Sequence, residues 1–257
     1  MKTDKNEPQK TQTMQPMCDP DTGVCEIPNF GAGASKAGPA PSAPTGEVIY
    51  VGDPMCSWCW GGSPGLRALQ AEAQQKGLPF RILVGGLRAG GGDPWNAQFK
   101  SFLRGHWEEI AERTGQPFST RFLDREQFNY DTEPSCRAFV VLRGMLAEQP
   151  GPTTHAYDAF ADIQRKFYAE NEDPTVVGFY ESLSAAYGLD FAEFRKRFES
   201  AEAKQQTSNE FREVRALGVN SFPTVLYRDG NGVQLLARGY VTGPRMVEAL
   251  SRAQNAR

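Results

Sequence analysis

The sequence predicts an α/β fold in which a βαβ unit and a later ββα unit are separated by a long helical segment. β-rich runs at 48–51 and 79–84 flank an amphipathic stretch, and two strands joined in this way should lie parallel. Runs at 224–227 and 234–238 enclose the turn sequence of residues 229–232, which is typical of a hairpin. Between the two units, apolar residues recur at helical spacing.

Composition limits the kind of protein this can be. The 257 residues, with 39% hydrophobic and 11% aromatic content, are enough for one large domain or a core domain with an insertion. A net charge of -3 gives no electrostatic argument for a nucleic-acid or anionic-membrane partner. No run approaches the roughly 18 apolar residues of a membrane span. We therefore expect neither a nucleic-acid partner nor a membrane partner.

The start of the chain bears on its compartment. Residues 1–30 are polar and hold no apolar core of a secretory signal, so we expect a cytoplasmic protein, or a periplasmic one if a leader has been lost. The five cysteines are too few for a disulfide scaffold. In a reducing compartment, a close cysteine pair is typical of redox or metal-binding sites.

Residues 1–46 are predicted to be a flexible arm, because their Pro-, Gly- and Ser-rich composition cannot bury enough apolar area. Cys18 and Cys25 lie in this arm, separated by turn-forming residues that could bring the thiols together. Three interpretations remain open: two free thiols, a local disulfide or auxiliary pair that exchanges with another site, or a metal site. The metal site is the least favoured, since no histidine or further cysteine is near in sequence.

The predicted organisation beyond the arm has two parts. Residues 47–93 and 218–257 form one domain, which ends in a helix over about 244–254. Residues 94–217 form a helical insertion with its own small aromatic core, and a glycine-rich hinge precedes it. The hinge lacks the Gly-Lys-Ser/Thr of a phosphate loop. The apolar stripes of the insertion are Phe99, Phe102, Leu103, Trp107 and Ile110; Ala138, Val141, Leu142 and Met145; Tyr157, Phe160, Ala161, Phe167 and Tyr168; Phe179, Leu183 and Tyr187; and Phe191, Phe194 and Phe198.

The candidate site is the cysteine pair Cys56 and Cys59, which follows the first strand and a turn. We expect the pair in the first turn of a helix that runs to about Gln75. Unpaired N–H groups and a partial positive charge at a helix start favour a thiolate, which is the reactive form. Cys56, with an exposed sulfur, would attack, and Cys59, more buried, would resolve the mixed disulfide. A zinc ribbon would need a second pair at suitable distance, and we predict no metal.

The neighbours of the pair define its surroundings. Ser57 and Trp58 lie between the cysteines, and neither is basic, so nothing here indicates an extreme oxidant. Asp53 could relay a proton or serve as a turn residue, and we favour the turn. Phe222 and Pro223 should form the other half of the site. A cis bond between them would leave the backbone of Phe222 beside Cys56, ready to pair with a substrate strand.

Three motifs together resemble the DsbA-like branch of the thioredoxin superfamily, in particular dithiol–disulfide isomerases with a Cys-Ser-Trp-Cys-Trp site. They are Asp53-Pro54-Met55-Cys56-Ser57-Trp58-Cys59-Trp60-Gly61, Ser221-Phe222-Pro223-Thr224 and Asn129-Tyr130-Asp131-Thr132-Glu133-Pro134-Ser135-Cys136-Arg137-Ala138. The resemblance covers about residues 47–255. It implies a thioredoxin fold split by an α-helical domain, a redox-active Cys56/Cys59 pair and a cis proline at Pro223. The arm with Cys18 and Cys25 lies outside the resemblance.

Cys136 and the two histidines of the chain lie outside the cysteine-pair segment. A lone cysteine on an apolar helix is most often a small buried hydrophobic residue, and we interpret Cys136 in this way. The resemblance places it near the active-site groove, where it would be an auxiliary thiol. His106 and His155 are interpreted as helix-surface or domain-packing residues.

The leading hypothesis is therefore a thiol–disulfide oxidoreductase, with no cofactor beyond its own disulfide. It would pass two electrons between Cys56/Cys59 and protein thiols or disulfides, or glutathione. A glutathione-dependent transferase or isomerase is the alternative enzyme, although enzymes of that kind often use a single nucleophile. A metal-binding module is the non-enzyme alternative. The direction of electron flow and the oligomeric state stay open.

Overall fold

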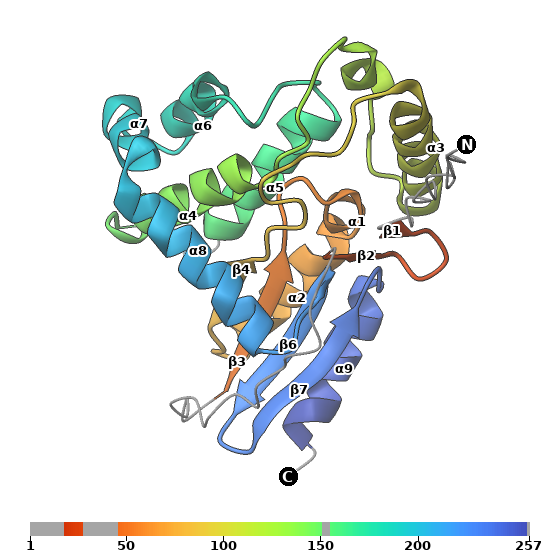
Figure 1. Cartoon of the computed structure of the whole chain (residues 1–257). Helices are drawn as coiled ribbons and strands as arrows, with labels where there is room; N and C mark the ends of the chain where they lie inside the picture. Colours follow the sequence, from red (N-terminus) through yellow and green to blue (C-terminus); the bar gives the residue numbers. More distant parts are fainter. Residues whose placement is uncertain (1–17, 28–45, 151–154, 256–257) are drawn as a thin grey trace, which may run out of the picture.

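The computed structural model describes residues 18–27, 46–150 and 155–255, and it has the predicted α/β fold with a helical insertion (Figure 1). A four-stranded sheet has the strand order β4-β3-β6-β7. Its strands are β3 (Glu47–Gly52), β4 (Phe80–Val84), β6 (Thr224–Asp229) and β7 (Gly232–Arg238). The strands β3 and β4 are parallel, whereas β6 and β7 form an antiparallel hairpin, as the sequence predicts.

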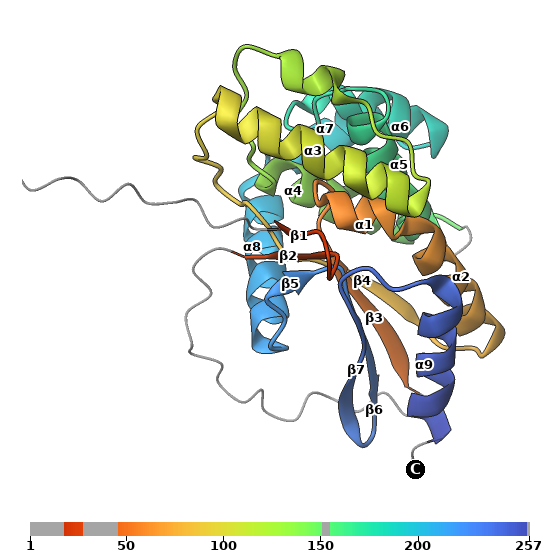
Figure 2. The same cartoon turned by 90° about the vertical axis from the view of Figure 1, so that its right-hand side faces the viewer.

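Helices lie on both faces of this sheet (Figure 2). The helices α2 (Ser63–Gln75) and α9 (Gly243–Asn255) lie together on one side, and α8 (Ala201–Ala216) lies on the other. Every residue of β3 is buried, which suits a central strand covered on both faces.

The helix expected to start at the cysteine pair is in fact two helices. A short helix α1 (Ser57–Gly61) ends at Gly62, and α2 begins at the next residue. The N–H of Gly62 donates to the carbonyl of Trp58 at 2.9 Å, which closes α1. Pro64 lies in the first turn of α2, where a missing N–H costs nothing. The two cysteines therefore lie at the start of a single short helical turn that is separate from α2.

The segment 94–217 is helical, as predicted. It contains α3 (Ala97–Thr114), the 3₁₀ helix η1 (Thr120–Asp124), α4 (Glu133–Ala147), α5 (His155–Tyr168), the 3₁₀ helix η2 (Val177–Tyr180), α6 (Glu181–Ala186), α7 (Phe191–Glu199) and α8. The division of the chain into domains at residues 47, 94 and 218 stays a prediction.

The expected separate aromatic core of this segment is wrong in one respect. An aromatic cluster does form among α3, η1 and α5, but it also contains Met55 and Trp60 from the active-site segment. A second apolar cluster runs without interruption from the sheet into α4, α5 and α7. Apolar faces pack against whatever apolar surface is nearest, and sequence periodicity does not reveal which surface that is.

Residues 18–27 of the arm are folded and lie beside α1, which the prediction of a flexible arm missed (Figures 1 and 2). The strands β1 (Cys18–Asp19) and β2 (Val24–Glu26) form a hairpin, and β5 (Ser221–Phe222) extends it to a three-stranded sheet. A disulfide joins Cys18 to Cys25, so the free-thiol interpretation is also wrong. The rest of the predicted arm, 1–17 and 28–45, lies outside the described residues. None of the helices in the described ranges is long and apolar enough to cross a membrane.

Candidate active site

Cys56 is the N-cap residue of α1, and Cys59 lies within that helix. The N–H of Cys56 donates to the carbonyl of Asp53 at 3.0 Å, and the carbonyl of Cys56 accepts from the N–H of Trp60 at 3.2 Å. The tight turn before the helix and the first turn of the helix thus fix the backbone of Cys56 on both sides. Both cysteines are free thiols.

The predicted exposure of Cys56 is wrong, because its exposed fraction is 0%, the same as that of Cys59. Burial raises the pKa of the Cys56 thiol well above its ordinary value, and the hydrogen bond with Cys59 acts in the same direction. The thiolate expected from the helix start alone is therefore opposed by desolvation. A five-residue helix offers little compensation for that cost.

Asp53 is fully buried and connects the loop before Cys56 to the loop after β4. One carboxylate oxygen accepts from the N–H of Met55 at 2.8 Å, which is the predicted turn role. The other oxygen accepts from the N–H of Leu87 at 2.7 Å and from the thiol of Cys136 at 3.4 Å. The pKa of Asp53 is raised above its ordinary value, because the effect of burial exceeds the opposite effect of the hydrogen bonds from Leu87 and Met55.

Cys136 lies in α4 with no exposed surface, as expected for a small buried residue. Its sulfur faces the active-site turn through Asp53. Burial raises the pKa of the Cys136 thiol well above its ordinary value, and the charge of Asp53 adds to the effect. The thiol is thus a hydrogen-bond donor to the carboxylate.

Two tyrosines that sequence reasoning assigned no site role hold the carbonyl just before Cys56. The hydroxyls of Tyr130 and Tyr168 donate to the Met55 carbonyl at 2.9 and 2.5 Å. Tyr168 had been recognised only as part of an apolar stripe, and Tyr130 only within the third motif. A hydroxyl on an otherwise apolar residue is the one signal that could have indicated such a role.

The Phe222–Pro223 peptide bond is cis, as predicted. The ring of Phe222 packs where a side chain on Gly85 would be, since a Cβ there would lie 1.8 Å from the ring. The backbone of Phe222 is not free for a substrate strand, however. In the antiparallel pairing of β2 with β5, Cys25 is the partner of Phe222, and Glu26 is the partner of Ser221.

The side chain of Trp58 joins α1 to α3 and to the loop after β7. Its ring contacts His106 and Tyr240, with centroid distances of 6.0 and 5.6 Å, and the Arg113 guanidinium lies 5.3 Å from it. Ser57, the other residue between the cysteines, is buried.

Of the two interpretations of His106, the helix-surface one is wrong, because only 5% of the residue is exposed. The packing interpretation agrees with the contacts of its ring with Trp58 and Phe102. Burial lowers the pKa of His106 to about 4, so the imidazole is neutral. Its Nε2 has no hydrogen-bond partner in the described part of the chain. His155 packs edge-on against Tyr187, far along the chain from the cysteine pair.

The sulfurs of Cys18 and Cys25 and a ring nitrogen of His106 lie within 4.8 Å of one another. Sequence reasoning had found no histidine near this pair, because the contact joins residues about 80 positions apart. The two sulfurs are bonded to each other, and a disulfide lacks the thiolate charge that zinc requires. In this oxidised state the cluster is a disulfide beside a neutral imidazole.

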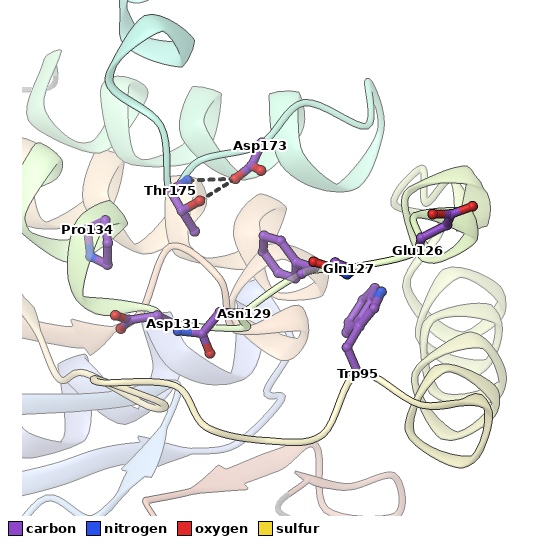
Figure 3. Close-up of a pocket in the computed structure, with 9 residues that line it drawn as sticks. Trp95, Glu126, Gln127, Asn129, Asp131, Pro134, Asp173 and Thr175 are labelled. Atoms are coloured by element: carbon purple, nitrogen blue, oxygen red, sulfur yellow. Dashed lines mark hydrogen bonds between the residues drawn. The ribbon is translucent and has the colours of Figure 1, made fainter.

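A surface pocket of about 590 Å³ has no cysteine in its lining (Figure 3). Its lining comes from the loop before α3, the loop before α4 and the loop before η2. Three of the lining side chains, Glu126, Asp131 and Asp173, are carboxylates. This acidic lining is poorly suited to an anionic ligand.

The fold and the geometry at Cys56 define a class. A thioredoxin-type sheet with a helical insertion, a cysteine pair two residues apart at a helix start, and a cis proline together characterise the thiol–disulfide oxidoreductases. No protein-family model matches the sequence.

Known proteins identify the family within this class. A crystal structure from Nitrosomonas europaea, described as a "putative protein disulfide isomerase", is 30% identical, with a TM-score of 0.73 over 83% of this chain and 100% of that chain. The cytosolic disulfide reductase DsbM from Pseudomonas aeruginosa with GSH is 25% identical, with a TM-score of 0.62 over 81% and 98% of the two chains. The ClpXP adapter protein SpxH of Halalkalibacterium halodurans is 23% identical over 84% of this chain and 68% of SpxH. The chain belongs to the DsbA-like disulfide oxidoreductases of the thioredoxin superfamily.

Proposed function

We propose that Cys56 and Cys59 carry the disulfide exchange of this enzyme, with Cys56 as the nucleophile and Cys59 as the resolving thiol. The observation that supports these roles best is the position of Cys56 at the N-cap of α1, with Cys59 within the same turn. Asp53, Ser57 and Trp58 are positioning residues that hold this turn. Pro223 and Phe222 form the opposite wall.

The exchange balances without any other reagent. The Cys56 thiolate attacks one sulfur of a substrate disulfide, forms a mixed disulfide and releases the other sulfur as a thiolate. Cys59 then attacks Cys56, which forms the Cys56–Cys59 disulfide and releases the second substrate thiol. Two electrons pass from the enzyme to the substrate, and each released thiolate takes up a proton.

We infer that the pair works as a reductant. A strong oxidant of this class stabilises its thiolate, so that the reduced form is favoured. Here burial raises the pKa of Cys56, which destabilises the thiolate and favours loss of electrons. The name of DsbM, a cytosolic disulfide reductase, agrees with this direction.

Protein disulfides and glutathione are the partners that we propose, in the cytoplasm. The DsbM relative was solved with GSH, which supports a small-thiol partner. The acidic pocket of Figure 3 is unsuited to the carboxylates of glutathione, so we expect glutathione to react at Cys56 rather than to be stored there. No cofactor beyond the protein's own disulfide is needed for this exchange.

The test compares wild type with Cys56→Ser and Cys59→Ser in insulin reduction and in exchange with glutathione disulfide. We expect Cys56→Ser to lower both rates by at least about a hundredfold, since a hydroxyl does not exchange with disulfides. Cys59→Ser should accumulate a mixed disulfide at Cys56, detected by mass spectrometry. Exchange that persists in a folded Cys56→Ser protein would overturn the assignment.

The direction is tested by equilibrating Cys56/Cys59 with glutathione buffers. We expect a reduction potential nearer to the roughly −270 mV of thioredoxin than to the roughly −120 mV of a strong oxidant. A value at the oxidising end would contradict the reductase assignment and leave the cysteine roles intact.

A further inference from the structure

The hairpin of residues 18–27 occupies the sheet edge where a substrate strand should pair. Its strand β2 runs antiparallel to β5, and Cys25 is the register partner of Phe222, the residue that precedes the cis proline. The N–H of Ile27 continues the pairing by donating to the carbonyl of Asn220 at 2.9 Å. Pairing with an exposed edge is how many proteins take up extended peptides. The arm therefore lies in place of such a peptide.

Specific contacts hold the hairpin there. Arg113 of α3 donates to the carbonyls of Pro20 and Asp21 at 2.5 and 3.2 Å. Gly23 has a φ of +66°, and a Cβ on it would lie 2.4 Å from the Cβ of Tyr240. Arg113 and Tyr240 both contact the ring of Trp58. The turn of the hairpin therefore packs closely against the residues that surround Trp58.

The disulfide is buried beside His106, whose ring contacts Trp58 between the two active-site cysteines. Cys25 has no exposed surface and Cys18 has 8%. Both belong to the same buried cluster as Cys56 and Cys59. The pairing of Cys25 with Phe222 and the contact of His106 with Trp58 thus bring the disulfide close to the active-site turn.

We propose that Cys18–Cys25 is a second redox-active pair, an internal substrate that exchanges electrons with Cys56/Cys59 of the same molecule. This inference rests on the proposed function of Cys56 and Cys59. While it is docked, the arm excludes protein substrates from the edge of β5. After its reduction, the hairpin loses its covalent link and yields the edge to a substrate strand.

The internal step needs no outside reagent. The sulfur of Cys56, as a thiolate, attacks one sulfur of the Cys18–Cys25 bond and releases the other as a thiolate, which is then protonated. Cys59 attacks Cys56 and frees the second arm thiol. The Cys18–Cys25 bond is reduced, and Cys56 and Cys59 are oxidised to a disulfide, so two electrons have moved within the molecule. His106, with a free buried Nε2, can accept a hydrogen bond from a thiol released beside it.

The main experiment follows the reduction of each pair in the full-length protein. Protein with both pairs oxidised is mixed with reduced glutathione, quenched in acid at intervals, alkylated and mapped by peptide mass spectrometry. In wild type we expect Cys18–Cys25 to open after Cys56–Cys59. In Cys56→Ser, where glutathione must attack the buried bond directly, it should open at least about tenfold more slowly. Equal rates would overturn the proposal and show that the disulfide is structural only.

A trapping variant supplies a second, independent readout. In Cys59→Ser the internal mixed disulfide cannot be resolved, so Cys56 should be found bonded to Cys18 or Cys25. Recovery of Cys56 only as a free thiol or a glutathione adduct counts against the proposal.

A matched pair of glycine variants tests docking. Gly23→Ala drives a Cβ into Tyr240 and should release the hairpin, slow the internal exchange by about tenfold and speed insulin reduction severalfold. Gly77→Ala has the same φ of +66° with no heavy atom within 4 Å of the new Cβ, so it carries the backbone strain without the contact. Its rates should equal those of wild type. Identical behaviour of the two variants would overturn the role of docking.

The two proposals fail separately. Exchange of Cys56/Cys59 with glutathione disulfide is measured in the Cys18→Ser/Cys25→Ser protein, which has no arm disulfide. If neither the wild type nor this variant exchanges with glutathione disulfide, the proposed function is wrong. Its persistence, together with equal arm reduction in wild type and Cys56→Ser, would overturn only the internal relay.

Discussion

The two cysteine pairs reach the same buried cluster by different means. Cys56 and Cys59 are brought together by one helical turn, so their geometry is local. Cys18 and Cys25 are seven positions apart and meet because they are opposite each other across a hairpin. That hairpin is held mainly by a strand more than 190 residues later in the chain. The sequence indicates that Cys18 and Cys25 could meet across a turn, but not where the resulting hairpin would dock.

Removal of Asp53 should have the largest effect on stability, and of the two cysteine pairs it should affect Cys56/Cys59. In Asp53→Ala the buried N–H groups of Met55 and Leu87 lose their acceptor, which should lower the free energy of unfolding by about 3 kcal/mol. The pKa of Cys56 should fall, because the charge of Asp53 helps to raise it. Urea unfolding and thiolate absorbance measure the two effects.

Asp131→Ala is the matched control for Asp53→Ala. Asp131 also accepts from two backbone N–H groups, those of Gly90 and Glu133, but it is only partly buried and does not contact the active-site turn. We expect a loss of about 1 kcal/mol and no change in the pKa of Cys56. Equal losses in the two variants would mean that burial of Asp53 contributes nothing.

His106, which lies beside the disulfide of the arm, should make the free energy of unfolding depend on pH. Because burial lowers its pKa from 6.5 to about 4, the folded protein favours the neutral imidazole. Below pH 6.5 the unfolded chain binds a proton at His106 and the folded protein does not. The free energy of unfolding therefore decreases as the pH falls from 6.5 toward 4. Relative to His106→Phe, which keeps a ring beside Trp58, wild type should lose about 2.5 kcal/mol between pH 7.5 and 4.5.

Urea unfolding of both proteins at the two pH values checks this prediction. Carboxylates titrate in both proteins, so their contribution cancels in the difference. A difference that is the same at pH 7.5 and 4.5 would show that the imidazole is hydrated in the folded protein.

The smallest effect is expected from the ion pair at the end of the hairpin. Arg238 and Glu26 are 3.0 Å apart, but roughly half of each side chain is exposed. Such a pair contributes about 0.3 kcal/mol. Glu26→Gln should therefore change the rate of Cys18–Cys25 reduction by less than about twofold. A tenfold change would mean that charge, rather than backbone pairing and the fit at Gly23, docks the arm.

The features that depend on short-range sequence patterns were predicted, whereas those that depend on contacts between distant segments were not. Strands near 48–51 and 224–227, the helical stripes and the position of Cys56 at a helix start follow from short-range patterns. The cis bond at Pro223 was predicted from the family resemblance together with the position of a proline at the start of a strand. The burial of Cys56 could not be predicted, since it depends on what packs over α1.

Other features of the site depend on contacts between distant segments. His106 reaches the arm sulfurs, and Tyr130 and Tyr168 reach the Met55 carbonyl, only after α3 and α5 have packed around α1. The arm was misjudged for a related reason. Its ordering does not come from an apolar run of its own, but from the backbone groups of β5 and from a disulfide.

The pairing of β2 with β5 also affects how copies of this protein meet one another. A bare sheet edge offers unpaired N–H and C=O groups to any extended chain, and natural proteins cover such edges to avoid association. Here a segment of the same chain supplies that cover at Ser221 and Phe222. The docked hairpin thus closes this short stretch of backbone to strand pairing with another copy of the protein.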